Sequence, residues 1–152
     1  MQYLVQPLAP HSANGPNYAN NQNRIFALSN ASSGLAVTAQ AQGVLMTHEK
    51  WDERDAQRWR LVPLGNNEFK IENAVSGLVL DVWYASHDEG ANVVLWPWNG
   101  GANQRWRLIE IELGHFRIES VNSGKALTGN PTVSNARGTV HQNTWNADFY
   151  QK

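Results

Sequence analysis

The segments WDERDAQRW (51–59) and WNGGANQRW (98–106) share one pattern, a tryptophan followed six residues later by Gln-Arg-Trp. The end of the chain, WNADFYQK (145–152), begins the same pattern and stops before the second tryptophan. The three copies follow one another at equal intervals. Self-similarity at a fixed period predicts an architecture of three like units.

Further columns agree upstream of these segments. FALSNASSG (26–34), FKIENAVSG (69–77) and FRIESVNSG (116–124) align without a gap. Between the glycine that ends each segment and the next repeated tryptophan, the first copy is four residues shorter than the others. The alignment places the repeats at about 24–64, 67–111 and 114–152, with residues 1–8 completing the last one.

The N-terminus supplies what the third repeat lacks. YLVQPL (3–8) aligns with WRLVPL (59–64) and WRLIEI (106–111), so Tyr3 takes the place of the missing tryptophan. A linear solenoid has no reason to split a repeat between its two ends, whereas a closed ring does. We therefore expect residues 1–152 to form one domain that closes on itself.

Each repeat has the pattern of strands. EFKIENA (68–74) and HFRIESV (115–121) alternate apolar and polar residues, which is typical of a half-buried strand. Short Val- and Leu-rich runs bounded by Gly, Asn and Asp add the others, which gives four strands per repeat and twelve in total. DERDAQRWR (52–60) could form one helical turn, and its glycine-containing copy excludes anything longer. The extra residues 9–23 are expected to form a polar surface connector.

The composition excludes several classes of function. The 152 residues suffice for one domain with a core, and the formal net charge of −1 gives no electrostatic footprint for nucleic acid or an anionic membrane. There is no cysteine and no apolar run long enough for membrane insertion. MQYLVQPLAPHS (1–12) lacks the features of a signal peptide, which favours a cytoplasmic protein and leaves non-classical export open.

Three four-stranded repeats that each carry Gln-x-Trp resemble the ricin B-type β-trefoil lectins and carbohydrate-binding modules. The middle repeat, SGLVLDVWYASHDEGANVVLWPWNGGANQRW (76–106), carries the resemblance most strongly. The resemblance implies an all-β fold, a six-stranded barrel capped by three hairpins with pseudo-threefold symmetry. It also implies that Gln-x-Trp is structural, with its Trp in the core and its Gln bonded to backbone in the loop. Val79 and Trp98 occupy positions that many members join by a disulfide.

In the family, a sugar is held by an aspartate, an aromatic platform and an asparagine. Only the middle repeat has all three, as Asp81, Trp96 and Asn103, with Gln104 at the border of the site. A carboxylate accepts hydrogen bonds from two adjacent hydroxyls, and a flat ring covers the C–H face of a sugar. The equivalents are Thr38, Glu49 and Ala56 in the first repeat and Thr128, Asn143 and Tyr150 in the third.

Other residues of the middle repeat bear on the site. Val94 stands where the family often has Gln or Asn, which predicts a lost hydrogen bond and a change in affinity or preferred sugar. Trp83 and Tyr84 occur in this repeat alone; they either widen the aromatic surface or pack beneath the loop. Residues shared by all repeats, including Trp51, Trp98 and Trp145, are predicted to be structural. Polar groups of the other repeats, such as His48 with Glu49 and His141 with Gln142, are predicted to lie in solvent-exposed loops.

No set of residues indicates an enzyme. The five histidines are scattered, none pairs at the spacing of a helical zinc site, and no phosphate-binding loop follows a strand. The sequence thus predicts a lectin without metal or cofactor, whose partners are glycans. The resemblance implies a terminal sugar of the galactose or N-acetylgalactosamine type. A single weak site would gain avidity from a homodimer or from fusion to another module. The alternatives are a protein-binding trefoil, such as a protease inhibitor acting through residues 9–23, and a targeting domain for a toxin or hydrolase.

Overall fold

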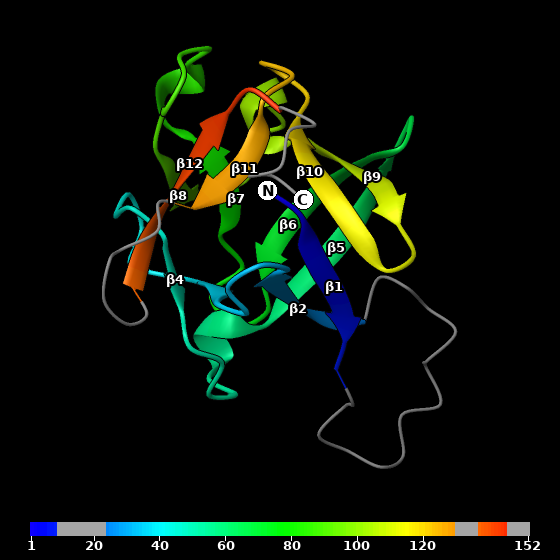
Figure 1. Cartoon of the computed structure of the whole chain (residues 1–152). Helices are drawn as coiled ribbons and strands as arrows, with labels where there is room; N and C mark the ends of the chain where they lie inside the picture. Colours follow the sequence, from blue (N-terminus) through cyan, green and yellow to red (C-terminus); the bar gives the residue numbers. More distant parts are fainter. Residues whose placement is uncertain (9–23, 130–136, 146–152) are drawn as a thin grey trace.

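The computed structural model describes residues 1–8, 24–129 and 137–145 (Figure 1), and these residues form twelve strands. Short 3-10 turns lie at Asp55–Gln57, Trp83–Ala85 and Ala102–Gln104. The segment 52–60 therefore contains a single turn, as predicted. The strands are β1 (Tyr3–Pro7), β2 (Ile25–Asn30), β3 (Ala36–Thr38), β4 (Thr47–Glu49), β5 (Trp59–Gly65), β6 (Glu68–Asn73), β7 (Val79–Val82), β8 (Val93–Trp96), β9 (Trp106–Glu112), β10 (His115–Ser120), β11 (Ala126–Gly129) and β12 (Arg137–Asn143).

Six of these strands form a closed antiparallel barrel. β1 pairs with β2, β2 with β5, β5 with β6, β6 with β9, β9 with β10, and β10 returns to β1. In Figure 1, β1 lies beside β2 and β10, which come from opposite ends of the sequence. Because β1 pairs with a strand on each side, its backbone N–H and C=O groups are hydrogen-bonded on both edges, and the barrel has no open sheet edge.

The register of the barrel is threefold. Trp59 lies opposite Phe26, Trp106 lies opposite Phe69, and Tyr3 lies opposite Phe116. The N-terminal strand thus takes the same place in the third repeat that β5 and β9 take in the first two. The predicted β-trefoil, with β1 completing the third repeat, is confirmed.

The remaining strands form three hairpins, β3–β4, β7–β8 and β11–β12, one from each repeat. β12 also pairs with β4, and isolated bridges join Leu45 to Val94 and Asn92 to His141. Each hairpin therefore contacts the others, which makes the cap one continuous layer. The loops of a hairpin are positioned by a neighbouring repeat as well as by its own strands.

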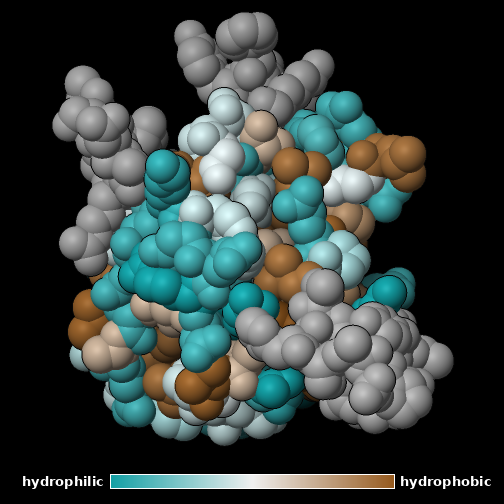
Figure 2. Space-filling view, turned by 90° about the horizontal axis from the view of Figure 1, so that it is seen from below, coloured by the Kyte–Doolittle hydropathy of each residue, from teal (hydrophilic) through white to brown (hydrophobic). Residues whose placement is uncertain are grey.

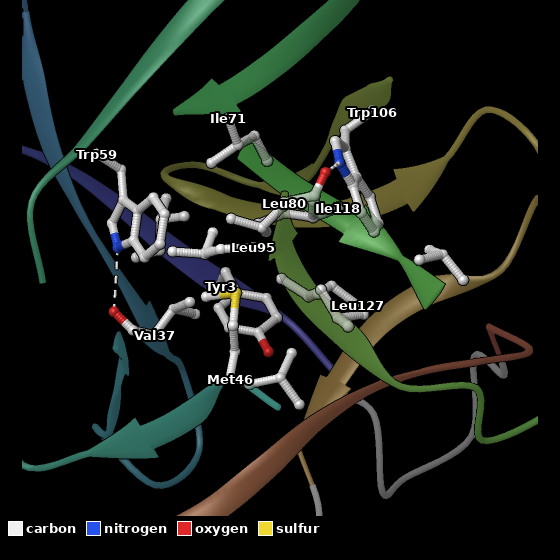
Figure 3. Packing of buried hydrophobic residues seen from close by; sticks show 14 of the residues in the cluster. Tyr3, Val37, Met46, Trp59, Ile71, Leu80, Leu95, Trp106, Ile118 and Leu127 are labelled. Atoms are coloured by element: carbon white, nitrogen blue, oxygen red, sulfur yellow. Dashed lines mark hydrogen bonds between the residues drawn. The ribbon is translucent and has the colours of Figure 1, made fainter. Parts of the chain in front are cut away.

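The core is filled by one aromatic and several aliphatic side chains from each repeat (Figure 3). Trp59 and Trp106 are fully buried, and each donates its indole N–H to a backbone carbonyl of the adjacent hairpin. The acceptors are Val37 O at 3.0 Å and Leu80 O at 3.2 Å. A buried Trp needs one such partner for its N–H, and the fold supplies it in both complete repeats.

Tyr3 follows a different arrangement from the two tryptophans. Its hydroxyl lies 2.7 Å from Nε2 of His48, and the two rings stack with centroids 5.7 Å apart. Burial, with a smaller contribution from the nearby His141, lowers the pKa of His48 to about 4, so the imidazole is neutral near pH 7. The expectation that His48, His141 and Gln142 belong to solvated loops is wrong, because all three side chains are buried.

The second tryptophan column lies outside the core. Trp51, Trp98 and Trp145 are each half-buried, and cations cover two of them. Lys70 Nζ and the Arg105 guanidinium lie 5.2 and 5.5 Å from the Trp98 ring, and Arg117 lies 5.2 Å from the Trp145 ring. A position repeated by symmetry is therefore not always part of the buried core.

The outer surface mixes polar and apolar residues. Figure 2 shows hydrophobic residues scattered singly or in small groups among hydrophilic ones on the face it presents. In the described part of the chain, no helix is long and apolar enough to cross a membrane.

Candidate functional site

The candidate site lies on the hairpin of the middle repeat, between the end of β7, the end of β8 and the turn at Ala102–Gln104. Asp81 is on β7 and is 5% exposed. Trp96 ends β8, and the burial of that strand changes abruptly there, from Val93–Leu95, which are buried, to Trp96, which is 39% exposed. Asp81 pairs with Val94, and residues two apart on a strand share one face, so the Trp96 ring lies on the same side of the hairpin as the carboxylate.

Two amides of the following turn fix the Asp81 carboxylate. Gln104 Nε2 donates to Oδ2 at 2.8 Å, and Asn103 Nδ2 donates to Oδ1 at 3.1 Å. Each carboxylate oxygen therefore has one donor from the protein and keeps a further lone pair for another. The carboxylate is oriented before any ligand arrives.

Gln104 holds the loop that surrounds the site. It also donates to Pro97 O at 2.9 Å and accepts from the backbone N–H of Asn99 at 2.7 Å. Its side chain is fully buried and its amide hydrogens and oxygen are all engaged. The structure therefore places Gln104 as a support for Asp81 rather than on the pocket wall.

Asn103 offers the pocket an acceptor. Its second amide hydrogen goes to Val82 O at 3.1 Å, so both N–H groups are used within the protein. Its Oδ1 is the atom left for a ligand. Asn99 offers the pocket a donor. Its Oδ1 accepts from Gly101 N–H at 2.8 Å, and its Nδ2 has no acceptor among the described residues.

The aromatic wall consists of three rings in contact. Trp83 meets Trp96 edge-on, with centroids 5.9 Å apart at 87°, and meets Tyr84 at 4.8 Å and 81°. Behind them lies Gly43 of the first repeat, whose positive φ of 75° and N–H bond to Leu95 O bring its Cα close to the rings. A Cβ at Gly43 would lie 3.4 Å from the Trp96 ring. The neighbouring repeat therefore supports the back of the aromatic wall.

These elements enclose one open pocket with a volume of about 480 Å³. The sequence-based prediction named five of its seven lining residues and placed two others, Gln104 and Val94, at the site. Asn99 and Ala85 were missed. The lining residues are Asp81, Trp83, Tyr84, Ala85, Trp96, Asn99 and Asn103.

Val94, like Gln104, is a predicted site residue that does not line the pocket. It is 3% exposed and lies opposite Asp81 in the β7–β8 pair. Residues opposite each other share one face of a sheet, so an apolar side chain flanks the carboxylate where a polar one would have solvated it. Burial raises the pKa of Asp81 above its usual value, and the hydrogen bonds from Gln104 and Asn103 partly offset the increase.

The first repeat shows what happens when these residues are replaced. Thr38 stands in the place of Asp81, accepts from Gln57 Nε2 at 3.1 Å and donates to Ala36 O at 2.9 Å. Glu49 stands in the place of Trp96 and is bonded by Thr47 at 2.6 Å and by Arg54 at 3.0 Å. The polar groups of this repeat therefore satisfy one another.

In the third repeat, Thr128 likewise donates to Ala126 O at 3.0 Å. Asn143 lies opposite Ala126, just as Trp96 lies opposite Val79. Tyr150 lies outside the described residues, as does the loop 9–23 to which protein binding was assigned as the alternative function. In the described ranges, no three His, Cys, Asp or Glu side chains gather in a way that could hold a metal ion.

Comparison with known proteins agrees with this architecture. Residues 17–96 match the family model described as ricin-type β-trefoil lectin domain-like. The designed threefold-symmetric protein ThreeFoil is 32% identical with a TM-score of 0.77, and the match covers 84% of this chain and 94% of that one. A search of curated proteins finds no match to the sequence.

Two further solved structures share the fold over the same 84% of this chain. An exo-β-1,3-galactanase from Clostridium thermocellum is 26% identical with a TM-score of 0.76, and the match covers 28% of its chain. A lectin from Polyporus squamosus is 18% identical with a TM-score of 0.72, and 46% of it is covered. The latter similarity shows the fold alone.

Proposed function

Because this chain belongs to the ricin-type β-trefoil lectin domain-like family, we propose that it binds a sugar reversibly in the pocket between Asp81 and Trp96. The observation that carries the proposal is the oriented carboxylate beside an exposed indole. A sugar has an apolar C–H face and a polar edge of hydroxyls, and the pocket offers a counterpart to each. The C–H face stacks on Trp96, and two hydroxyls donate to Asp81.

The other polar groups of the pocket complete the recognition. A hydroxyl both donates and accepts hydrogen bonds, so a site for it needs acceptors and donors. Asp81 and Asn103 supply acceptors, and Asn99 Nδ2 supplies the donor. We assign the sugar to the galactose or N-acetylgalactosamine type, which the family resemblance implies and which the similarity to an exo-β-1,3-galactanase supports.

The proposed activity is binding without catalysis, and it is weak. One open pocket with three or four polar contacts is expected to bind a monosaccharide at about millimolar to tens of micromolar, or about −4 to −6 kcal/mol. Useful avidity then requires a second copy of the chain or another binding module.

Asp81→Ala is expected to weaken galactoside binding by about 1.5–3 kcal/mol, because it removes hydrogen bonds to a charged acceptor. Isothermal titration with methyl β-galactoside measures the loss. Thr38→Ala is the matched control, since Thr38 holds the same position in the first repeat, and it should leave the affinity unchanged. Equal affinities for the wild type and Asp81→Ala would remove Asp81 from the site.

Binding by the wild type should also weaken in acid. As the pH falls through the raised pKa of Asp81, the carboxyl becomes protonated and no longer accepts from both hydroxyls, so the dissociation constant rises. Protonation of Asp81 should not unfold the protein in acid. The pKa of Asp81 is raised in the folded state, so its contribution to the free energy of unfolding decreases as the pH rises, not as it falls. Asp81→Ala should lack this acid dependence.

A further inference from the structure

We infer that the pocket holds a second sugar residue on Tyr84, so that its ligand is a disaccharide or a longer glycan. This inference rests on the proposed sugar site at Asp81 and Trp96 and extends it. Tyr84 lines the same pocket as Asp81 and Trp96, and its side chain is 84% exposed. Trp83 contacts both Trp96 and Tyr84, so the three rings are continuous. If one sugar residue stacks on Trp96, the sugar residue linked to it would therefore still lie over an aromatic surface.

The backbone that presents Tyr84 is strained. Tyr84 and Ala85 have φ values of 56° and 52°, consecutive left-handed conformations that residues other than glycine rarely adopt. A solvent-exposed turn under no constraint would use Gly or Asn at such positions. Here the strained pair carries a large aromatic ring into solvent, and strain of this kind is concentrated where a site needs a side chain in one place.

Contacts from two sides hold the strained turn. Asn122 of the third repeat donates to Ala85 O at 2.9 Å, and Ser86 N–H bonds to Trp83 O at 3.2 Å. The Tyr84 ring rests against the Trp83 indole at an interplanar angle of 81°, so the contact between the two is edge to face. The ring is therefore ordered before binding, which lowers the entropy lost when a ligand stacks on it.

The first repeat has no room in its sequence for this turn, whereas the third repeat has a connection of the same length. Asp81 and Val94 pair across it, and the first repeat pairs Thr38 with Thr47 across a connection four residues shorter. That shorter connection carries Gly43, which packs beneath Trp83 and Trp96. The longer loop of the middle repeat thus carries two aromatic rings, Trp83 and Tyr84, and the shorter loop of the first repeat places a glycine against Trp83 and Trp96.

The chemistry of Tyr84 suits a sugar. A phenol ring gives a flat apolar face for C–H groups, and its hydroxyl at the rim both donates and accepts hydrogen bonds. An apolar partner surface would favour a ring without a polar rim. A neutral ring beside the acceptors Asp81 and Asn103 favours a ligand rich in hydroxyls.

The test compares one monosaccharide with disaccharides that contain it. Methyl β-galactoside and galactosyl-β-1,3-, β-1,4- and β-1,6-galactose are titrated calorimetrically into the full chain. The wild type should bind at least one disaccharide about three- to tenfold tighter than the methyl glycoside, an increment typical of one added aromatic contact. In Tyr84→Ala, this ratio of dissociation constants should fall close to one, whereas Tyr84→Phe should retain most of it.

Two further variants separate the subsite from general effects. Leu113→Ala removes a side chain that is 94% exposed on the β9–β10 hairpin, outside the pocket, and should leave the ratio unchanged. Asn122→Ala frees the strained turn and should reduce the ratio in part. A ratio that is the same in the wild type and Tyr84→Ala would overturn the second subsite alone. Absence of binding to all four sugars would overturn the proposed galactoside function and the subsite with it.

Discussion

Trp106→Ala is expected to destabilise the protein by about 3–5 kcal/mol, the range measured when a large buried aromatic is truncated. Trp106 is fully buried in the barrel, and no neighbour can fill its volume without moving a strand. The variant also leaves Leu80 O without the indole N–H that it accepts at 3.2 Å. Thermal or urea unfolding measures the change, and the melting temperature should fall by roughly 10 °C.

The matched control is Trp98→Ala. Both tryptophans recur by symmetry, but Trp98 is half-buried and interacts with the cations of Lys70 and Arg105 at the surface. Its removal deletes less buried area and creates no closed cavity, so the loss of stability should be clearly smaller. Equal losses in the two variants would contradict the distinction between core and surface columns.

Trp96→Ala is expected to have the opposite profile, with binding lost and stability nearly kept. Trp96 is 39% exposed and ends its strand, so truncation opens no cavity in the core. The indole is the proposed platform for the C–H face of the sugar, and removal of such an anchor typically costs about 2–4 kcal/mol of binding. From a starting affinity of about −4 to −6 kcal/mol, that loss brings binding below detection.

Calorimetric titration with methyl β-galactoside and thermal unfolding of the same sample measure both properties. Trp96→Phe keeps a flat ring and should recover part of the affinity. A Trp96→Ala variant that binds normally, or one that melts as early as Trp106→Ala, would show that the ring belongs to the scaffold.

The sequence was sufficient for the fold because closure of the barrel is visible in the repeat columns. Tyr3 aligns with Trp59 and Trp106, and the structure pairs all three with equivalent phenylalanines. The repeat columns alone do not show burial, because Trp98 and Trp106 are each repeated. The family resemblance assigned the tryptophan of Gln-x-Trp to the core, and the barrel confirms this for Trp106.

The candidate site was predictable where it breaks the symmetry. Asp81, Trp96 and Asn103 differ from their counterparts in the other repeats, and they meet in one pocket. Asn99 was missed because the equivalent of this residue in the first repeat, Asp52, is also polar, so the column looks like scaffold. The hydrogen-bond directions of Asn103 and Gln104 depend on backbone carbonyls that no spacing reveals.

We propose that the middle repeat alone binds a sugar, since its carboxylate and indole line an open pocket while the polar groups of the first repeat bond to one another. A crystal structure of the protein soaked with methyl β-galactoside tests this most directly. We expect the sugar to lie over Trp96, with two of its hydroxyls donating hydrogen bonds to Asp81. A sugar bound at the first or third repeat, with the pocket between Asp81 and Trp96 empty, would contradict it.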